Sequence, residues 1–412
     1  MSLPTTTSKI NYMTNQTNAK KPNLICLILL ISFPSFTTVF ISPALPVIGS
    51  YLAISASLTQ QLITVFVIGY AFGQLLYSPF ANRFGRKPTI YLGVGIFIVS
   101  SIICIFAVYC RDIDVMIWCR FFMALGAAVG MIISFTMISD VYSPQDARRA
   151  ISYTVLAYAF MPAIGIAIGG FITTHLSWVV CFYFNVIYGL FILFISFLLP
   201  ETLQQKNHHA LKLKPLLQSY RAAFTNQQLL AFSFIYGLMA SFIYIVASGA
   251  PFIGIDTIGL TPADYGALLL IPYSGQFLGA LVAGRFSAKF TPYQAMFIGY
   301  SSTVFGCLLM FVTFLCGWVN PFSLFAPIFF IMMGLPMTYS TVTVMALKKF
   351  PDKATGSAIM SFITMLTALV FSFILTLLPA KKPLMMPSVE IVVCVIAITM
   401  FVYVKRRYAK DT

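Results

Sequence analysis

Long apolar runs of about 20 residues, separated by short polar segments, restrict this chain more than any other feature of its sequence. A helix of about 20 apolar residues crosses roughly 30 Å of hydrocarbon, and inside lipid only helices and closed barrels satisfy their own backbone hydrogen bonds. The 412 residues are 59% hydrophobic and only 8% charged, whereas soluble domains are roughly half apolar and a quarter charged. The sequence therefore predicts an all-α integral membrane protein.

Twelve of these runs are long enough to span a bilayer. Prolines inside them do not argue against helices, because neighbouring helices can satisfy the backbone groups that a proline frees. We expect transmembrane helices at 24–48, 60–80, 90–109, 115–141, 151–173, 178–199, 229–252, 265–286, 295–318, 322–347, 355–379 and 388–404.

The positive charges indicate the orientation. The two tails and the interhelical segments on the same side as the tails hold 21 of the 25 Lys and Arg residues, an excess that is typical of cytoplasmic segments. We therefore expect both termini in the cytoplasm of a bacterial-type cell, with the spans in its inner membrane. The cations lie in short clusters between apolar runs, without the exposed basic face that nucleic-acid binding needs. We expect no nucleic-acid partner.

The longest polar interval, 201–228, divides the spans six and six. The expected organisation is a cytoplasmic tail, a six-helix bundle, a cytoplasmic linker, a second six-helix bundle and a short tail, at 1–22, 23–200, 201–228, 229–404 and 405–412. The linker segment LKLKPLLQSYRAAF alternates cations with leucines. It allows two interpretations, an amphipathic piece on the anionic inner leaflet or a plain cationic linker held inside by topology.

The two halves resemble each other. GQLLYSPFANRFGRK (73–87) matches GQFLGALVAGRFSAK (275–289) at seven of fifteen positions with a constant displacement of 202 residues. Such parallel repeats are found in transporters whose binding site lies at the membrane midplane between the halves. The sequence therefore predicts two pseudo-symmetric six-helix bundles.

Seven short motifs, in order along the chain, resemble signatures of the major facilitator superfamily and are most similar to the bicyclomycin-resistance (Bcr/CflA) branch of its twelve-helix drug:proton antiporters. They are SPALP (42–46), SPFANRFGRKP (78–88), RFFMALGAA (120–128), MPAIGIAIGG (161–170), PETL (200–203), SGAPF (248–252) and FPDKATGSA (350–358). The resemblance implies the major facilitator fold and transport by alternating access, with the two bundles rocking around a midplane site.

The resemblance also implies a gate at the cytoplasmic loop between the second and third spans. In the family, the arginine matching Arg86 pairs with an acid matching Asp140, and the loop acid lies near the start of the eleventh helix. Here that acid is replaced by Asn82, which keeps a capping oxygen but carries no charge. The competing interpretation of the loop is a topology signal alone. The expected gate residues are Asn82, Arg83, Gly85, Arg86, Asp140 and Arg285.

A second group of residues is expected at the central cavity or in energy coupling. The resemblance places Arg120 there, although an arginine this near a helix end can also extend outward to the interface. Met123 replaces the family's glutamine, and Glu390 is the acid nearest to a span centre, unless it merely begins the last helix. The full set is Gln74, Arg120, Met123, Gln276 and Glu390.

The fifth span carries the residues that resemble the antiporter signature. Small residues let membrane helices approach closely, so plain packing is one interpretation, and a kinked, leak-resistant helix is the other. Ile166 replaces the proline of that signature. The residues concerned are Pro162, Gly165, Gly169 and Gly170.

These observations predict a monomeric secondary transporter that exports small organic compounds, drug-like or metabolite, by multidrug-type antiport. We expect no enzymatic activity, no cofactor and no metal, with membrane lipid and the substrate as the partners. Protons are a candidate coupling ion, but none of the ten acids lies at the middle of a span, and a proton carrier is most often a desolvated carboxylate. An uncoupled facilitator or importer of a nutrient or weak acid is therefore the alternative.

Overall fold

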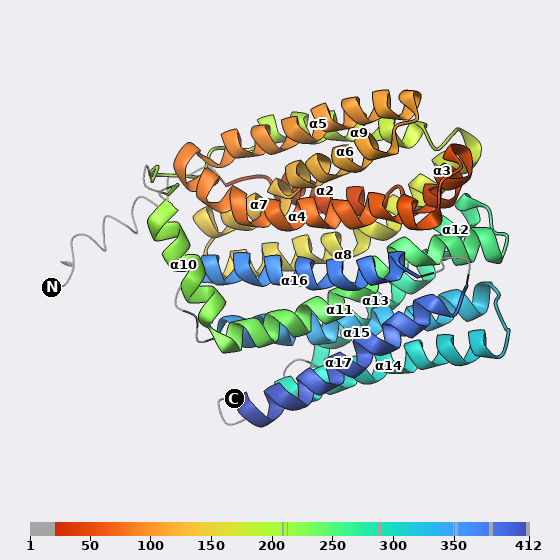
Figure 1. Ribbon diagram of the computed structural model, residues 1–412. Helices are drawn as coiled ribbons and strands as arrows, with labels where there is room; N and C mark the ends of the chain where they lie inside the picture. Colours follow the sequence, from red (N-terminus) through yellow and green to blue (C-terminus); the bar gives the residue numbers. More distant parts are fainter. Residues whose placement is uncertain are drawn as a thin grey trace, which may run out of the picture.

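In the computed structural model, the residues described are 21–207, 210–211, 213–286, 290–348, 350, 353–378 and 382–408. Over these ranges every regular element is a helix, so the all-α prediction is confirmed (Figure 1). The expected N-terminal tail up to residue 20 lies outside the described residues, and so do two loop histidines and several cations used for the orientation: His208, His209, Lys212, Lys289, Lys349, Lys381 and Lys410.

The first half of the chain supplies one bundle. Its elements are α2 (Leu24–Val39), the 3-10 turn η1 (Ser42–Ala44), α3 (Leu45–Leu52), α4 (Ala56–Phe84), α5 (Arg86–Cys110), α6 (Ile113–Ala127), α7 (Val129–Val141), α8 (Pro144–His175) and α9 (Val180–Leu198).

The second half follows a linker helix. The elements are α10 (Leu213–Thr225), α11 (Gln227–Pro251), the π-helical segment η2 (Phe252–Thr257), α12 (Pro262–Leu268), α13 (Leu270–Phe286), α14 (Pro292–Leu315), α15 (Pro321–Leu347), α16 (Lys353–Thr376) and α17 (Met385–Tyr408).

Polar residues set the starts of many helices. In each case a side-chain oxygen accepts a hydrogen bond from a first-turn amide, which otherwise has no partner in the helix. The capping residues are Asn23, Ser55, Asp112, Ser143, Asn226, Thr261, Thr291 and Asn320. These caps explain why most helices start earlier than the apolar runs alone predict.

Three expected spans are interrupted rather than continuous. The first breaks after Val39, because Pro43 and Pro46 supply no backbone N–H and their rings clash with the preceding turn. The fourth divides at Ala128 into α6 and α7, and the eighth divides at Leu269 into α12 and α13. Each of the three still forms one membrane-crossing segment, Leu24–Leu52, Ile113–Val141 and Pro262–Arg285, so the predicted spans are present with a local break in each.

The described residues contain 11 helices long and apolar enough to cross a membrane. The remaining expected span corresponds to α8, whose apolar part is Phe160–His175. All twelve expected runs are therefore helical.

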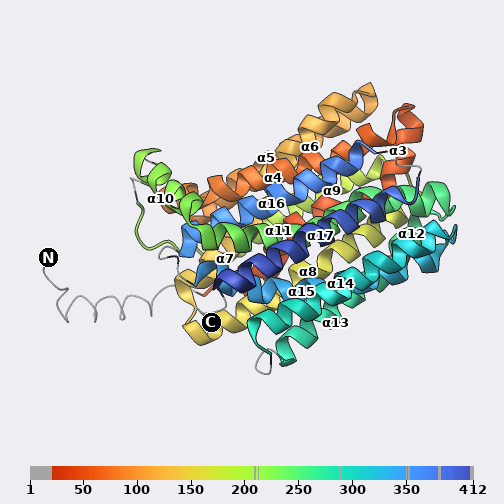
Figure 2. The same ribbon diagram turned by 60° about the horizontal axis from the view of Figure 1, so that its bottom comes forward.

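Elements α2 to α9 form one bundle and α11 to α17 the other, and α10 lies across one end (Figures 1 and 2). We call the end that holds α10 and the end of α17 the termini end, and the opposite end the far end. Between the bundles, α4 packs against α16 and α8 against α12. Within them, the strongest packing joins α4 to α6 in the first bundle and α14 to α15 in the second.

The repeat is present in the packing, but at a different register from the one expected. Gly69 of α4 abuts the carbonyl of Phe121, and Gly275 of α13 abuts that of Phe329. Gly275 therefore corresponds to Gly69, at an offset of 206, and not to Gly73 at 202. The same offset relates two further tightly packed pairs, Gly73 to Gly279 and Gly93 to Gly299. Four residues are about one helical turn, so both registers align the same helix face, which is why the shorter offset also produced matches.

Candidate functional site

A cluster of charged and polar side chains lies at the termini end of the first bundle. Arg86, only 5% exposed, donates from Nε to Asp140 Oδ2 at 3.0 Å and from a terminal nitrogen to Oδ1 at 3.3 Å. Its other terminal nitrogen donates to Asn82 Oδ1 at 2.8 Å. The hydroxyl of Thr202 donates to Asp140 Oδ2 at 2.8 Å. The ion pair implied by the family resemblance is present.

Glu201 completes this group and was missed as a site residue from the sequence. Its carboxylate accepts the backbone N–H groups of Arg86 at 3.0 Å and Lys87 at 3.1 Å, at the start of α5. Gly85 has φ 117°, and a side chain there would collide with this carboxylate. The signal was an acid in the PETL motif, directly after the sixth span, α9, and following a basic loop earlier in the same bundle. We call Asn82, Arg86, Asp140, Glu201 and Thr202 the latch cluster.

The hydrogen bonds of Glu201 predict that this residue stabilises the protein. Glu201→Ala should lower the stability of the protein by about 1–2 kcal/mol, because two first-turn amides of α5 lose a charged acceptor. The melting temperature in detergent measures this loss. Glu201→Gln is the matched control, because it keeps an acceptor oxygen and should melt between the two. An alanine variant as stable as the parent would show that this cap contributes nothing.

Three gate residues lie differently from expectation. Asn82 was expected to cap the eleventh helix, but its side-chain oxygen accepts from Arg86, four residues on. Its backbone carbonyl accepts from Asn207 of the linker at 2.9 Å. The guanidinium of Arg83 lies over the ring of Phe84 at 5.4 Å, and Arg285 is exposed at the end of α13, away from the latch cluster.

The linker helix α10 contacts both bundles at the termini end. Tyr220 donates its hydroxyl to the carbonyl of Leu75 in α4 at 3.0 Å, and α10 also packs against α11 and α16. Burial raises the pKa of Tyr220, so the phenol stays protonated and remains a donor at neutral pH. The linker therefore connects the two bundles instead of hanging free between them.

Arg120 is fully buried, so it does not extend outward to the interface, and its assignment to the central cavity stays a prediction. It donates to the backbone carbonyls of Thr37 at 3.3 Å, Thr38 at 3.0 Å and Leu62 at 3.1 Å. Its guanidinium also lies 4.1 Å from the ring centroid of Phe66. Thr37 and Thr38 are in the last turn of α2, where carbonyls lack helical partners and the helix dipole is negative. The break in the first span thus creates the site for this cation.

Met123 and Glu390 are not cavity residues. Met123 is fully buried in the apolar core of the first bundle. Glu390 is fully buried on α17, which packs against α11, α14 and α16, all in the second bundle. One turn later, Cys394 contacts Cys307 of α14, with 3.5 Å between the sulfurs. Neither carboxylate oxygen of Glu390 has a hydrogen-bond partner among the described residues.

The two glutamines lie where the bundles face each other. On α4, Gln60 and Thr64 bond to the second bundle, and Gln74 shares their helix face by its spacing. On α13, Gln276 follows Gly275, which packs against α15, and α13 also packs against α8 of the first bundle. Both side chains are more than nine-tenths buried, and among the described residues Gln74 Nε2 and Gln276 Oε1 have no hydrogen-bond partner.

The small residues of the fifth span, α8, act as packing surfaces. Gly165 and Gly169 lie against the backbone of α2 at Phe36 and Phe40, and Gly170 lies against Pro262 at the start of α12. Pro162 is buried inside α8. The contact of Gly170 crosses between the bundles, so this face closes the far end as well as holding α8 to α2.

Four uncharged hydrogen bonds join the bundles at the far end. Two of them anchor on α11, from Ser42 Oγ to the carbonyl of Ala247 at 2.5 Å and from Gln60 Nε2 to that of Ser248 at 3.2 Å. The other two join Thr64 Oγ1 with Ser372 Oγ at 3.3 Å and the Ala263 amide, as donor, with Thr174 Oγ1 at 2.9 Å. The far end is therefore closed by direct contact of the two bundles.

Known proteins share this architecture. The chain is 30% identical to an uncharacterized transporter of Rickettsia felis over 71% of this chain and 72% of the relative. It is 25% identical to multidrug resistance protein D of Escherichia coli (80% and 81% covered) and 25% identical to a bicyclomycin resistance protein homolog of Haemophilus influenzae (65% and 66%). A partially occluded, inward open structure of the Escherichia coli xylose transporter XylE superposes with a TM-score of 0.72 at 14% identity, covering 91% of this chain and 96% of that one.

The family model that matches this chain is that of the Major Facilitator Superfamily, over residues 25–376. The match covers the first bundle, the latch cluster, the linker and the second bundle up to the end of α16. The relatives named for drug resistance are consistent with the Bcr/CflA branch. The chain therefore belongs to the Major Facilitator Superfamily of membrane transporters.

Proposed function

We propose that this transporter exports small organic compounds, drug-like or metabolite, across a bacterial inner membrane by alternating access. The observation that carries the proposal is the closure of the far end by four hydrogen bonds between the bundles, opposite the latch cluster. Alternating access requires a protein that is closed at one end at a time and can close the other end instead. The names of the drug-resistance relatives support an organic substrate.

In this mechanism the bundles at 23–200 and 229–404 rock as units, while the linker at 201–228 and the tails stay on one side. The clustered cations at the termini end favour the cytoplasm for that side. The arrangement described here then corresponds to a state closed to the outside. The latch cluster would help to close the cytoplasmic end in the opposite state, with Arg86 held by Asp140 in both.

Substrate contacts are assigned to the two buried glutamines. Each has an unpaired amide atom between the bundles, one a donor and the other an acceptor. Such groups recognise neutral or amphipathic molecules without demanding a charge. A site of this kind suits polar organic compounds and suits polyanions poorly.

Gln74→Leu tests this assignment. Losing one hydrogen bond to substrate should raise the apparent KM about five- to tenfold, whereas protein stability should stay equal or rise, because the leucine replaces an unpaired buried amide. Transport kinetics and melting temperature are measured on the same samples. Gln228→Leu is a control, because that side chain donates to the Met345 carbonyl at 2.9 Å and should lose stability instead. An unchanged KM for Gln74→Leu would remove this residue from the site.

Energy coupling separates two candidate functions. Proton antiport follows the family resemblance. An uncoupled facilitator or importer is favoured by the neutral Asn82 in the gate loop, whereas the fully buried carboxylate of Glu390, without a hydrogen-bond partner among the described residues, is the kind of desolvated acid that proton antiport uses. A susceptibility panel in a pump-deficient host identifies substrates first. Counterflow in proteoliposomes with and without a pH gradient then decides, since transport that ignores the gradient would exclude proton antiport.

A further inference from the structure

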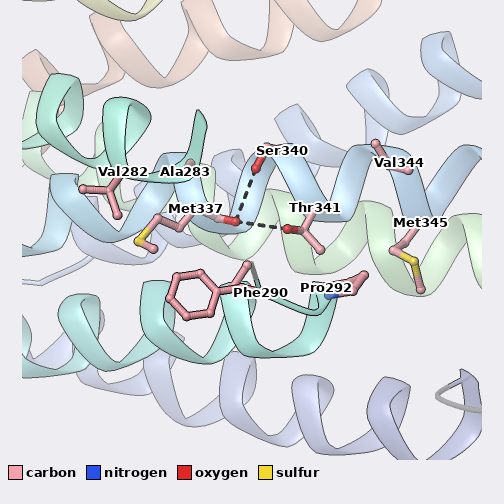
Figure 3. A pocket seen from close by; sticks show the side chains of 10 residues that line it. Val282, Ala283, Phe290, Pro292, Met337, Ser340, Thr341, Val344 and Met345 are labelled. Carbon is pink, nitrogen blue, oxygen red and sulfur yellow. Dashed lines mark hydrogen bonds between the residues drawn. The ribbon is translucent and has the colours of Figure 1, made fainter. Parts of the chain in front are cut away.

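A groove of about 330 Å³ lies at the termini end of the second bundle, between α13 and α14 (Figure 3). Val282 and Ala283 of α13 form one wall, and Pro292 and Ala295 of α14 form the other. Side chains from the last turns of α15, among them Met337, form the floor. We call this space the α13–α14 groove.

Among the described residues, the groove lies where the first bundle holds the guanidinium of Arg86. At the offset of 206, the position of Arg86 at the start of α5 corresponds to Pro292 at the start of α14. In the first bundle α4 packs directly against α5, and the charged side chains fill their junction. Over the described residues, α13 and α14 each pack against α15 and make little contact with each other. The α4–α5 junction is therefore polar and filled, whereas the corresponding α13–α14 junction is apolar and open.

The groove opens on an exposed apolar surface. Leu278, Leu281 and Val282 are 44%, 52% and 36% exposed and recur at the spacing of one helix face. Val282 is the member of that stripe that also lines the groove. Inside, the hydroxyls of Ser340 and Thr341 donate to the carbonyl of Met337 at 3.5 and 3.3 Å, as Figure 3 shows. They need no partner from a ligand, so the groove offers an apolar interior.

Positive charge surrounds the mouth of the groove. Arg285 follows Val282 by one turn on α13, and Lys348 follows the lining residue Val344 by one turn on α15; both cations are exposed. None of the 10 lining residues is acidic. The volume is at the low end of the roughly 300–1,000 Å³ of small-ligand sites, which fits one hydrocarbon chain better than a whole amphiphile.

We propose that the α13–α14 groove binds one acyl chain of an anionic phospholipid, whose phosphate lies near Arg285 and Lys348. Anionic lipids of the cytoplasmic leaflet are attracted by basic residues at the membrane surface, and the apolar interior takes the chain. In the second bundle, the lipid would occupy the position that corresponds to the latch cluster of the first bundle. This proposal does not depend on the substrate or the direction of transport.

Native mass spectrometry of the delipidated protein tests the proposal, with phosphatidylglycerol and phosphatidylcholine of identical chains added in separate titrations. The intact protein should retain one phosphatidylglycerol more tightly than any phosphatidylcholine. Arg285→Gln should weaken that binding about fivefold, and Ala295→Trp should abolish it by filling the groove. Leu281→Trp is the matched control, because its side chain lies on the same exposed stripe outside the groove.

Melting temperatures of all four proteins are measured to exclude misfolding of the tryptophan variants, and Arg285→Gln tests the site without adding bulk. Equal retention of phosphatidylglycerol by the intact protein and Ala295→Trp would overturn the proposal. Equal affinity for the two lipids, or no effect of Arg285→Gln, would also overturn it, since the site would then not recognise the anionic headgroup.

Discussion

Arg120→Ala is expected to lower the stability of this transporter by about 3–5 kcal/mol and to abolish transport. Arg120 donates to carbonyls of Thr37, Thr38 and Leu62 in a fully buried site. At the low end of about 1 kcal/mol for each buried acceptor left without a partner, the three carbonyls cost about 3 kcal/mol, and loss of the contact with the Phe66 ring adds up to about 2 kcal/mol. The melting temperature in detergent and substrate efflux in a pump-deficient host measure the two effects.

Arg120→Lys separates charge from geometry. A lysine keeps the positive charge, which the negative end of α2 favours, but its compact ammonium lacks the wide, fixed fork with which the guanidinium reaches carbonyls on two helices. We expect a melting temperature between those of the parent and the alanine variant. A residue that served only substrate contact or proton coupling would leave the melting temperature of Arg120→Ala unchanged. That result would contradict the structural role, and normal efflux by Arg120→Ala would remove it from transport.

The fold was predictable because one physical constraint dominates the sequence. Lipid forces each apolar run to be a helix, and the excess of cations on alternate segments sets the number of spans to an even one. Helix ends were less predictable, since they depend on single capping residues such as Ser55 and Asn226. The break after Val39 depends on two prolines that are also compatible with a continuous kinked helix.

A contact in the site was predictable only where the family motif implies both residues of the pair. The Arg86–Asp140 pair followed from a family resemblance and is present at 3.0 Å. Arg120 was recognised as unusual, but its partners are backbone carbonyls, which leave no mark in the sequence. The acidic side chain of Glu390 looked available for coupling, yet its orientation toward α14 depends on helix rotation, which hydropathy does not report.

The repeat shows the same limit. Aligning Gly73 with Gly275 maximised identities, whereas the backbone contacts pair Gly275 with Gly69. Helical periodicity makes registers one turn apart nearly equivalent in sequence, and only packing distinguishes them. The correction matters for function, because it places the start of α14 opposite the start of α5 and reveals where the second bundle lacks the latch cluster.

A disulfide between the bundles at the far end should stop transport. Thr64 Oγ1 and Ser372 Oγ lie 3.3 Å apart, on α4 and α16, and cysteines at such positions can close a bond of about 2.05 Å with little backbone movement. In the Thr64→Cys, Ser372→Cys variant, oxidation by oxygen with copper phenanthroline should reduce the transport rate at least tenfold. Dithiothreitol should restore it, because the block is a covalent link and not a misfolded state.

The parent protein provides the matched control for oxidation. Its eight cysteines include Cys307 and Cys394, whose sulfurs lie 3.5 Å apart inside the second bundle. A bond between these two would join helices that move together, so the oxidised parent should keep its transport rate. The two variants with one added cysteine, Thr64→Cys and Ser372→Cys, should keep it as well. If the cross-linked double variant still transported at the parental rate, the far end would not open during the cycle, and alternating access by separation of α4 from α16 would be wrong. Loss of transport confined to the oxidised double variant would instead identify the α4–α16 contact as the outer gate, held shut by uncharged hydrogen bonds and therefore insensitive to salt.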